Sequence, residues 1–270
     1  MYLACIGAAV TIVGVLGLVT WFIFASGASH LSLEFFTQLP SGDPAQPGGM
    51  KHAIFGTLVL IGIASVVGVP LGVLAGVYLS EYSNERWLAN PVRFIADVLT
   101  GVPSIVVGIL GYELVVVPMG GHSGWAGAAA LAFIMVPLVA RTTEEMLRLV
   151  PQSYREASLG LGATKAETIL RVVLPAATGS MITGIMLAVA RIAGETAPLL
   201  FTALGSRFLT ADLSQPFPSL TVQIFTYATG PYPEQKRLAW AGILVLVAIL
   251  FVLNISVRVM AARTVKLKRG

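Results

Sequence analysis

The chain has 270 residues, of which 56% are hydrophobic and 11% are charged, and its mean hydropathy is +0.84. This composition excludes a soluble globular protein and indicates an integral membrane protein, which we interpret as one transmembrane domain over residues 1–270. The net charge of +4 is carried mostly by residues that set membrane topology, so it predicts no nucleic-acid partner.

Six hydrophobic segments along the chain are long enough to cross a bilayer. A helix needs about 20 residues to cross the hydrocarbon core. The segments are Leu3–Ala25, Ala53–Ser80, Pro91–Pro118, Gly124–Ala140, Pro175–Leu204 and Leu238–Val257. The sequence therefore predicts an all-α membrane protein with six transmembrane helices inserted in a lipid bilayer.

The first segment contains Cys5, the only cysteine, which excludes an internal disulfide framework and a multi-cysteine metal site. Leu3-Ala4-Cys5 faintly resembles a lipoprotein cleavage site, but no basic segment and apolar run precede it. We therefore expect the first span to be a retained helix.

Glycine and proline are frequent in the second and third spans. Small residues allow helices to approach closely, and proline permits a kink where neighbouring groups satisfy the freed carbonyls. The residues are Gly68, Pro70, Gly72 and Gly76 in the second span and Gly101, Pro103, Gly108 and Gly111 in the third. We expect neither span to be a straight rod.

Lysine and arginine fall mostly on one side of the predicted membrane. That side has eleven of them: Arg86, Arg141, Arg148, Arg155, Lys165, Arg171, Arg258, Arg263, Lys266, Lys268 and Arg269. The other side has four: Lys51, Arg207, Lys236 and Arg237. The positive-inside rule therefore predicts that both termini and the segment 141–174 lie in the cytoplasm.

A polar insert separates the fourth span from the fifth. Two S/T-x-x-E patterns, typical of capping boxes, predict short helices that begin at Ser153–Glu156 and at Thr164–Glu167. Gly160 and Gly162 lie between them, where a chain reversal favours residues that tolerate positive φ. Pro175 is expected to end the second helix. The insert is thus predicted to be a helix-turn-helix outside the bilayer.

The same insert resembles the EAA loop of ATP-binding-cassette (ABC) importer permeases, which docks on a cytoplasmic ATPase. The matching positions are Glu156, Ala157, Ser158, Gly162, Leu174 and Pro175, with serine in place of the second alanine of the pattern. The resemblance implies that residues 141–174 form an ATPase coupling loop. No G-x-x-x-x-G-K-[ST] sequence occurs in the chain, so ATP and Mg²⁺ would be used by the partner ATPase, and we expect this chain to bind no cofactor.

Arg191 and Glu195 are ionisable residues in the otherwise apolar fifth span. Such residues are costly in a membrane and usually face a polar pathway. If the helix begins at Pro175, Arg191 lies about 24 Å along it, past the midplane, and the four-residue spacing places both side chains on one face. Gly194 and Pro198 weaken the helix here, as happens beside transport sites. We interpret the two residues as part of a substrate path, with a self-neutralising structural pair as the alternative.

The two side chains favour phosphate as the transported anion. A guanidinium binds an oxyanion through two parallel hydrogen bonds. At neutral pH phosphate keeps a proton that Glu195 would accept, whereas sulfate has none. Arg93 and Asp97 in the third span are interpreted as a structural pair near the cytoplasmic end. Glu113 is predicted near the outer surface, and we assign it no role.

Further segments sharpen the resemblance to one family. They are G-T-L at 56–58, V-P-L-G-V at 69–73, Y-L-S-E-Y at 78–82, G-V-P-S-I-V at 101–106, R-I-A-G-E-T-A-P-L-L at 191–200 and S-L-T-V-Q-I at 219–224. They are similar to segments of the PstA family, the permease subunits of phosphate-specific ABC importers. The resemblance implies a MetI-like type I fold and a prokaryotic inner membrane location. It also implies three kinds of partner: a homologous PstC-like permease, PstB-like ATPases and an extracytoplasmic PstS-like phosphate-binding protein.

Other functions fit the sequence less well. A permease for sulfate or molybdate is the alternative within the same fold. A membrane-embedded enzyme is disfavoured, because His30, His52 and His122 lie in loops or at span ends and no H-E-x-x-H or G-x-S-x-G occurs. A secondary transporter would need no EAA-like insert. The external segment Gly205–Arg237, with a regular stretch at Leu220–Ala228, is expected to be a landing surface for a soluble partner, with a solvated connection as the alternative.

Overall fold

A computed structural model describes residues 1–43, 45–82 and 86–267, so Lys268 and Arg269 of the basic tail lie outside the described residues. Within these ranges the regular structure is helical, without a β-strand element. Among the described residues, five helices are long and apolar enough to cross a membrane, and a bent helix pair makes a sixth candidate span. The predicted all-α architecture with six spans is confirmed.

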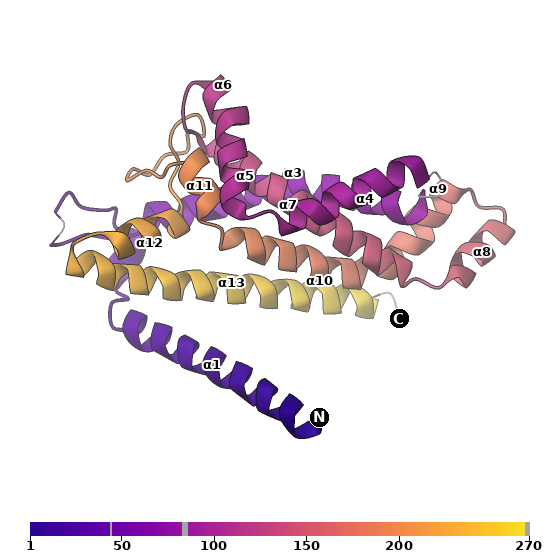
Figure 1. Ribbon diagram of the computed structural model, residues 1–270, viewed down its shortest axis with the longest axis horizontal. Coiled ribbons are helices and arrows are strands. Elements are labelled where there is room, and N and C mark those ends of the chain that lie inside the picture. The colour runs from indigo at the N-terminus through magenta and orange to yellow at the C-terminus, as the bar shows by residue number, and fades with distance from the viewer. Residues whose placement is uncertain (44, 83–85, 268–270) are drawn as a thin grey trace.

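Figure 1 shows how the helices are arranged, with labels numbered in chain order. Their bounds are α1 Tyr2–Ala28, α2 Leu33–Thr37, α3 Lys51–Glu81, α4 Arg86–Gly101, α5 Ser104–Gly111, η1 Tyr112–Val116, α6 Val117–Met119, α7 Gly124–Arg148, α8 Gln152–Gly160, α9 Lys165–Thr168, η2 Ile169–Val173, α10 Leu174–Ala193, α11 Ala197–Thr202, α12 Leu220–Thr229 and α13 Pro233–Leu267.

The centre of the bundle is the packing of α3 against α7. Gly72 and Gly76 lie one turn apart on α3 and let its backbone meet α7 directly. A Cβ atom on Gly72 would lie 2.6 Å from the Cβ of Val139, and one on Gly76 would lie 2.5 Å from the Cβ of Thr143. Pro70 does not interrupt α3, which is one helix of 31 residues.

The third predicted span is broken rather than continuous. α4 lies along the bundle, whereas α5 turns away from it through 106° (Figure 1). Pro103 precedes α5 with extended backbone, φ −57° and ψ 134°, because a proline cannot continue the α4 hydrogen-bond ladder. α5 then packs on α11, where a Cβ on Gly108 would lie 2.9 Å from the Cα of Pro198.

The fifth predicted span begins earlier and ends earlier than expected. A continuous apolar helix runs from Lys165 through α9, η2 and α10 to Ala193. The prediction that Pro175 ends a helix is wrong, because Pro175 occupies the first turn of α10 directly after the π-helical turn η2. Arg191 therefore lies 26 residues, or about 39 Å, along the helix rather than 24 Å.

The start of α1 and the end of α13 lie at the same end of the bundle as α8 and α9, and α6 and α12 lie at the opposite end (Figure 1). The predicted stretch Leu220–Ala228 corresponds to α12. α12 is fixed to the bundle, because the Leu220 amide donates to the Thr57 hydroxyl of α3 at 2.7 Å. Of the external segment, this part is therefore packed structure, and a purely solvated connection is excluded for it.

Candidate functional site

The polar insert forms two helical pieces joined by a tight turn. The capping box predicted at Thr164 and Glu167 is present, with the threonine hydroxyl accepting from the Glu167 amide and the glutamate accepting from the Thr164 amide. The box predicted at Ser153 is wrong. α8 starts one residue earlier, directly after Pro151, whose ψ of 139° already sets the direction of the chain.

The turn between the two pieces depends on one glycine. Gly162 has φ 88°, a conformation that favours glycine, as predicted. Gly160 is instead the last residue of α8 and lies outside the positive-φ region. The turn brings the Ser158 hydroxyl within 2.9 Å of the Thr168 hydroxyl, so α8 folds back on the start of the fifth span.

The EAA-like residues divide into an exposed group and a half-buried group. Glu156 and Ala157 are exposed on α8, whereas Leu174 and Pro175 are half-buried at the start of α10. Leu174 packs against a small core that includes Leu147 and Val173. The structure therefore presents a free helical face on α8 and anchors the far end of the motif in the bundle.

An ion pair links α8 to the end of α3, and the sequence analysis did not predict it. Arg155 donates to both carboxylate oxygens of Glu81, at 2.6 and 3.0 Å. The same guanidinium donates to the carbonyls of Val150 at 2.7 Å and Leu147 at 2.9 Å. The hydrogen bond to Glu81 raises the pKa of Arg155, so the arginine stays charged. The two residues are 74 apart in sequence and lie on different helices, so no local pattern indicated that they pair.

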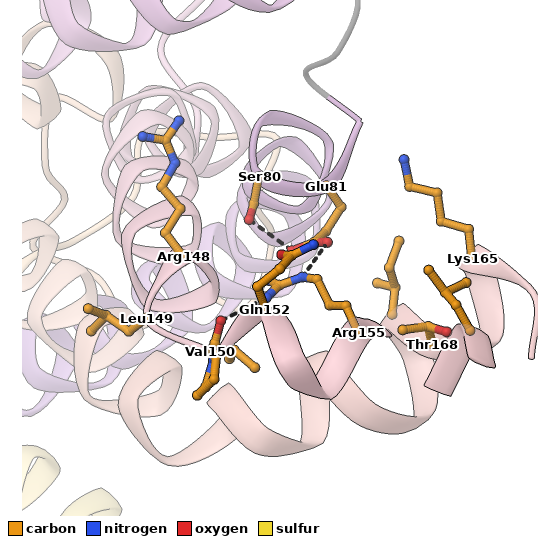
Figure 2. Close-up of a pocket in the computed structure, with 12 residues that line it drawn as sticks. Ser80, Glu81, Arg148, Leu149, Val150, Gln152, Arg155, Lys165 and Thr168 are labelled. Atoms are coloured by element: carbon orange, nitrogen blue, oxygen red, sulfur yellow. Dashed lines mark hydrogen bonds and ion pairs between the residues drawn. The ribbon is translucent and has the colours of Figure 1, made fainter. Parts of the chain in front are cut away.

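A pocket of about 630 Å³ lies beside this ion pair (Figure 2). Its walls come from the ends of α3 and α7 and from α8, α9 and η2. The lining residues are Ser80, Glu81, Arg148, Leu149, Val150, Pro151, Gln152, Arg155, Leu159, Lys165, Thr168 and Ile169. Apart from the ion pair, α8 is thus separated from the end of α3 by open space.

A second charge cluster surrounds Glu144 of α7, whose side chain is 1% exposed. Arg93 of α4 reaches one carboxylate oxygen at 2.7 Å, and Arg148 reaches the same oxygen at 2.6 Å. Arg141 lies 2.8 Å from the other oxygen and 2.7 Å from Asp97. The predicted Arg93–Asp97 pair is therefore wrong: α4 lies alongside α7, and each member pairs with α7 instead.

Replacing Glu144 by glutamine should lower stability. Three partly exposed arginines would lose the negative charge that they share. We expect the free energy of unfolding to fall by about 1–3 kcal/mol, less than for a fully buried pair. The measurement is the thermal unfolding midpoint of the detergent-solubilised protein. Glu145→Gln, an exposed position on the same helix, is the matched control, and an equal midpoint for both variants would contradict the assigned role of Glu144.

Arg191 and Glu195 lie at the break between α10 and α11. The prediction that they share a helix face is wrong, because α10 ends at Ala193 and Gly194 caps it. The predicted weakening of the helix at this level is confirmed. The guanidinium and carboxylate are 3.9 Å apart, which is longer than a hydrogen bond. The Arg191 side chain is 50% exposed, and the Glu195 carbonyl accepts from the Thr221 hydroxyl of α12 at 2.9 Å.

Two helix breaks meet at Arg191. Its side chain lines a small cavity together with Thr100, Val102 and Ser104, which flank the break between α4 and α5. The cavity measures about 10 Å³, which is room for one water molecule at most. The exposed half of Arg191 is therefore the part that can meet an anion in this arrangement. No group of three His, Cys, Asp or Glu side chains suited to a metal ion occurs within the part of the chain that the structure describes.

Comparison with known proteins defines the family. Residues 68–266 match the family described as binding-protein-dependent transport system inner membrane component. The phosphate transport system permease protein PstA of Yersinia pestis is 47% identical over 246 residues, which cover 90% of this chain and 83% of that protein. The chain belongs to the PstA family. The PstA protein of Haemophilus influenzae is 42% identical, with coverage of 88% and 85%.

This PstA family member also has the fold of solved ABC importer permeases. A chain of the MetNI methionine ABC transporter superposes with a TM-score of 0.68 over 78% of this chain and 94% of that chain, at 18% identity. A chain of an amino acid ABC transporter superposes with a TM-score of 0.56 at 20% identity, over 79% and 90%. At this identity the likeness concerns the fold, and it confirms the predicted MetI-like architecture. Its family membership makes the chain a permease subunit of an ABC transporter.

Proposed function

We propose that this PstA family member is the membrane permease subunit of an ATP-driven phosphate importer. The observation that carries the proposal is the 47% identity to a phosphate transport system permease protein over 90% of the chain. The arginine at the α10–α11 break supports it, because a half-exposed guanidinium beside a broken helix suits contact with an oxyanion.

The insert couples the permease to an ATPase in this proposal. Residues 141–174 contain α8, whose Glu156 and Ala157 are exposed and accessible to a partner. The chain has no ATP-binding P-loop sequence, so PstB-like ATPases hydrolyse ATP with Mg²⁺. α8, the start of α1 and the end of α13 lie at one end of the bundle (Figure 1). The excess of lysine and arginine in the sequence falls on the same side, and we assign this end to the cytoplasm.

The remaining partners complete the transport path. A homologous PstC-like permease supplies the facing half, and an extracytoplasmic PstS-like protein delivers phosphate at the end that carries α6 and α12. Closure of the ATPases pushes α8 and rocks the spans between inward-open and outward-open states. Arg191 offers a transient anion contact, and Glu195 accepts the proton that phosphate retains at neutral pH.

Anion competition tests the proposed substrate against the alternative of sulfate or molybdate. The complete complex is reconstituted in proteoliposomes with the binding protein, and uptake of radiolabelled phosphate is measured in the presence of excess unlabelled anion. Unlabelled phosphate should suppress uptake, and sulfate and molybdate should leave it unchanged. Suppression by sulfate or molybdate at concentrations equal to that of phosphate would assign the chain to the broader oxyanion class.

Replacing Glu195 by glutamine should weaken the discrimination between phosphate and sulfate. The glutamine amide both donates and accepts, so the preference for a protonated anion is reduced, by about tenfold if one charge-assisted hydrogen bond is lost. The measurement is the ratio of the two uptake rates. Glu113→Gln, an exposed carboxylate on η1, is the control. An unchanged ratio in Glu195→Gln would remove Glu195 from the selectivity mechanism.

A further inference from the structure

We propose that the ion pair between Arg155 and Glu81 is the contact that transmits movement of α8 to the transmembrane helix α3. This role rests on the proposed coupling of α8 to an ATPase. Arg155 and Glu81 would act as positioning residues, because neither lies on the proposed path of the transported anion.

The geometry of the pair suits the transmission of force. The guanidinium contacts both carboxylate oxygens, and this two-pronged arrangement fixes orientation as well as distance. The side chains are 14% exposed for Arg155 and 6% for Glu81, so solvent screens the pair weakly. The carbonyls of Val150 and Leu147 hold the same guanidinium from the α7 side. Arg155 therefore connects α8, the end of α7 and the end of α3 at one point.

No other side-chain hydrogen bond or ion pair among the described residues joins α8 to α3. The remaining polar contact of α8, from Ser158 to Thr168, leads into the start of the fifth span. Around the ion pair lies the 630 Å³ pocket, so close packing does not duplicate the link (Figure 2). Among the polar side-chain contacts of the described residues, this ion pair is therefore the direct link between α8 and α3.

α3 can carry a displacement of α8 to the opposite end of the bundle. It is a single unbroken helix that packs on α7 through its glycines. At its other end the Thr57 hydroxyl accepts from the Leu220 amide of α12. The neighbouring Thr221 holds the Glu195 carbonyl at the α10–α11 break. Direct contacts therefore run from the ion pair, through α3 and α12, to the residues proposed to line the substrate path.

The test compares wild type with Glu81→Gln in the assembled complex, reconstituted in proteoliposomes at matched protein content. The readouts are phosphate uptake and ATP hydrolysis, expressed as phosphate moved per ATP hydrolysed. We expect the ratio to fall by about tenfold, the scale of one charge-assisted pair, while basal ATP hydrolysis persists. Glu145→Gln removes one exposed carboxylate at the same end of the bundle and should leave the ratio unchanged.

A merely structural role gives a different result, because less complex would lower uptake and hydrolysis together and keep their ratio. An unchanged ratio in Glu81→Gln would overturn the proposal. If Glu81→Gln does not assemble, Arg155→Lys is measured instead, since lysine keeps the charge but loses the two-pronged contact. If wild type moves no phosphate, the proposal that phosphate is the substrate is wrong. The role of the Arg155–Glu81 ion pair is then tested by the ratio of transported anion to hydrolysed ATP, measured with the anion that wild type does carry.

Discussion

Arg191→Gln is expected to reduce phosphate uptake by the reconstituted complex roughly 10- to 100-fold and to leave basal ATP hydrolysis intact. Hydrogen bonds that involve a charged group contribute about 1.5–3 kcal/mol, and about 1.4 kcal/mol corresponds to a factor of ten. Glutamine keeps a donor but loses the charge and the two-pronged geometry. The coupling insert lies at the other end of the fifth span, so hydrolysis should not change.

The matched control for this prediction is Arg237→Gln. Arg237 is an external arginine whose contact is Glu234, three residues away, at 2.9 Å on the surface of α13. Its replacement should change uptake less than twofold, since exposed pairs contribute about 0–1 kcal/mol. Equal uptake by wild type and Arg191→Gln would instead make Arg191 and Glu195 a structural pair and place the anion contact on the partner permease.

The second large effect is expected from Gly72→Leu, which should prevent recovery of a folded complex. Even the first side-chain carbon would lie 2.6 Å from the Cβ of Val139 and 2.9 Å from the carbonyl oxygen of Val136 on α7. Helix association in a membrane depends on close backbone approach at such small residues. A leucine here forces α3 away from α7 and separates the centre of the bundle.

Gly62→Leu on the same helix is the control, because no atom lies within 4 Å of a Cβ placed at Gly62. The measurement is the yield of monodisperse complex after detergent extraction, judged by size-exclusion chromatography. Gly62→Leu should match wild type, whereas Gly72→Leu should give aggregated or unassembled chain. A normal elution profile for Gly72→Leu would show that the α3–α7 interface tolerates separation, contrary to the packing described.

The sequence predicted the spans well because hydrophobic length is a local property. It located all six segments, the turn at Gly162, and the Thr164 capping box, each of which depends on residues close together in the chain. The effect of each proline on its helix was harder to predict. Pro103 breaks a span, whereas Pro70 lies within an unbroken helix and Pro175 lies in a first helical turn. Whether a proline breaks a helix depends on the neighbouring turns and helices, which local sequence does not specify.

The charge pairs were predicted poorly because they depend on tertiary contacts. Spacing of four residues suggested Arg93 with Asp97, but the structure places Arg93 against Glu144 of another helix. Arg155 and Glu81 are distant in sequence, so no periodicity connects them. Arg191 and Glu195 were recognised as unusual by their charge alone. Their actual geometry followed from a helix break that the sequence indicated only through Gly194 and Pro198.

The most direct test of the central claim is ATP-dependent accumulation of radiolabelled phosphate in proteoliposomes. Vesicles containing the ATPase, the partner permease and this chain, with the phosphate-binding protein on the opposite side of the membrane from the ATPase, are compared with vesicles that lack this chain. We expect accumulation that requires both ATP and this chain. Equal phosphate accumulation without the chain, or none when every component and ATP are present, would contradict it.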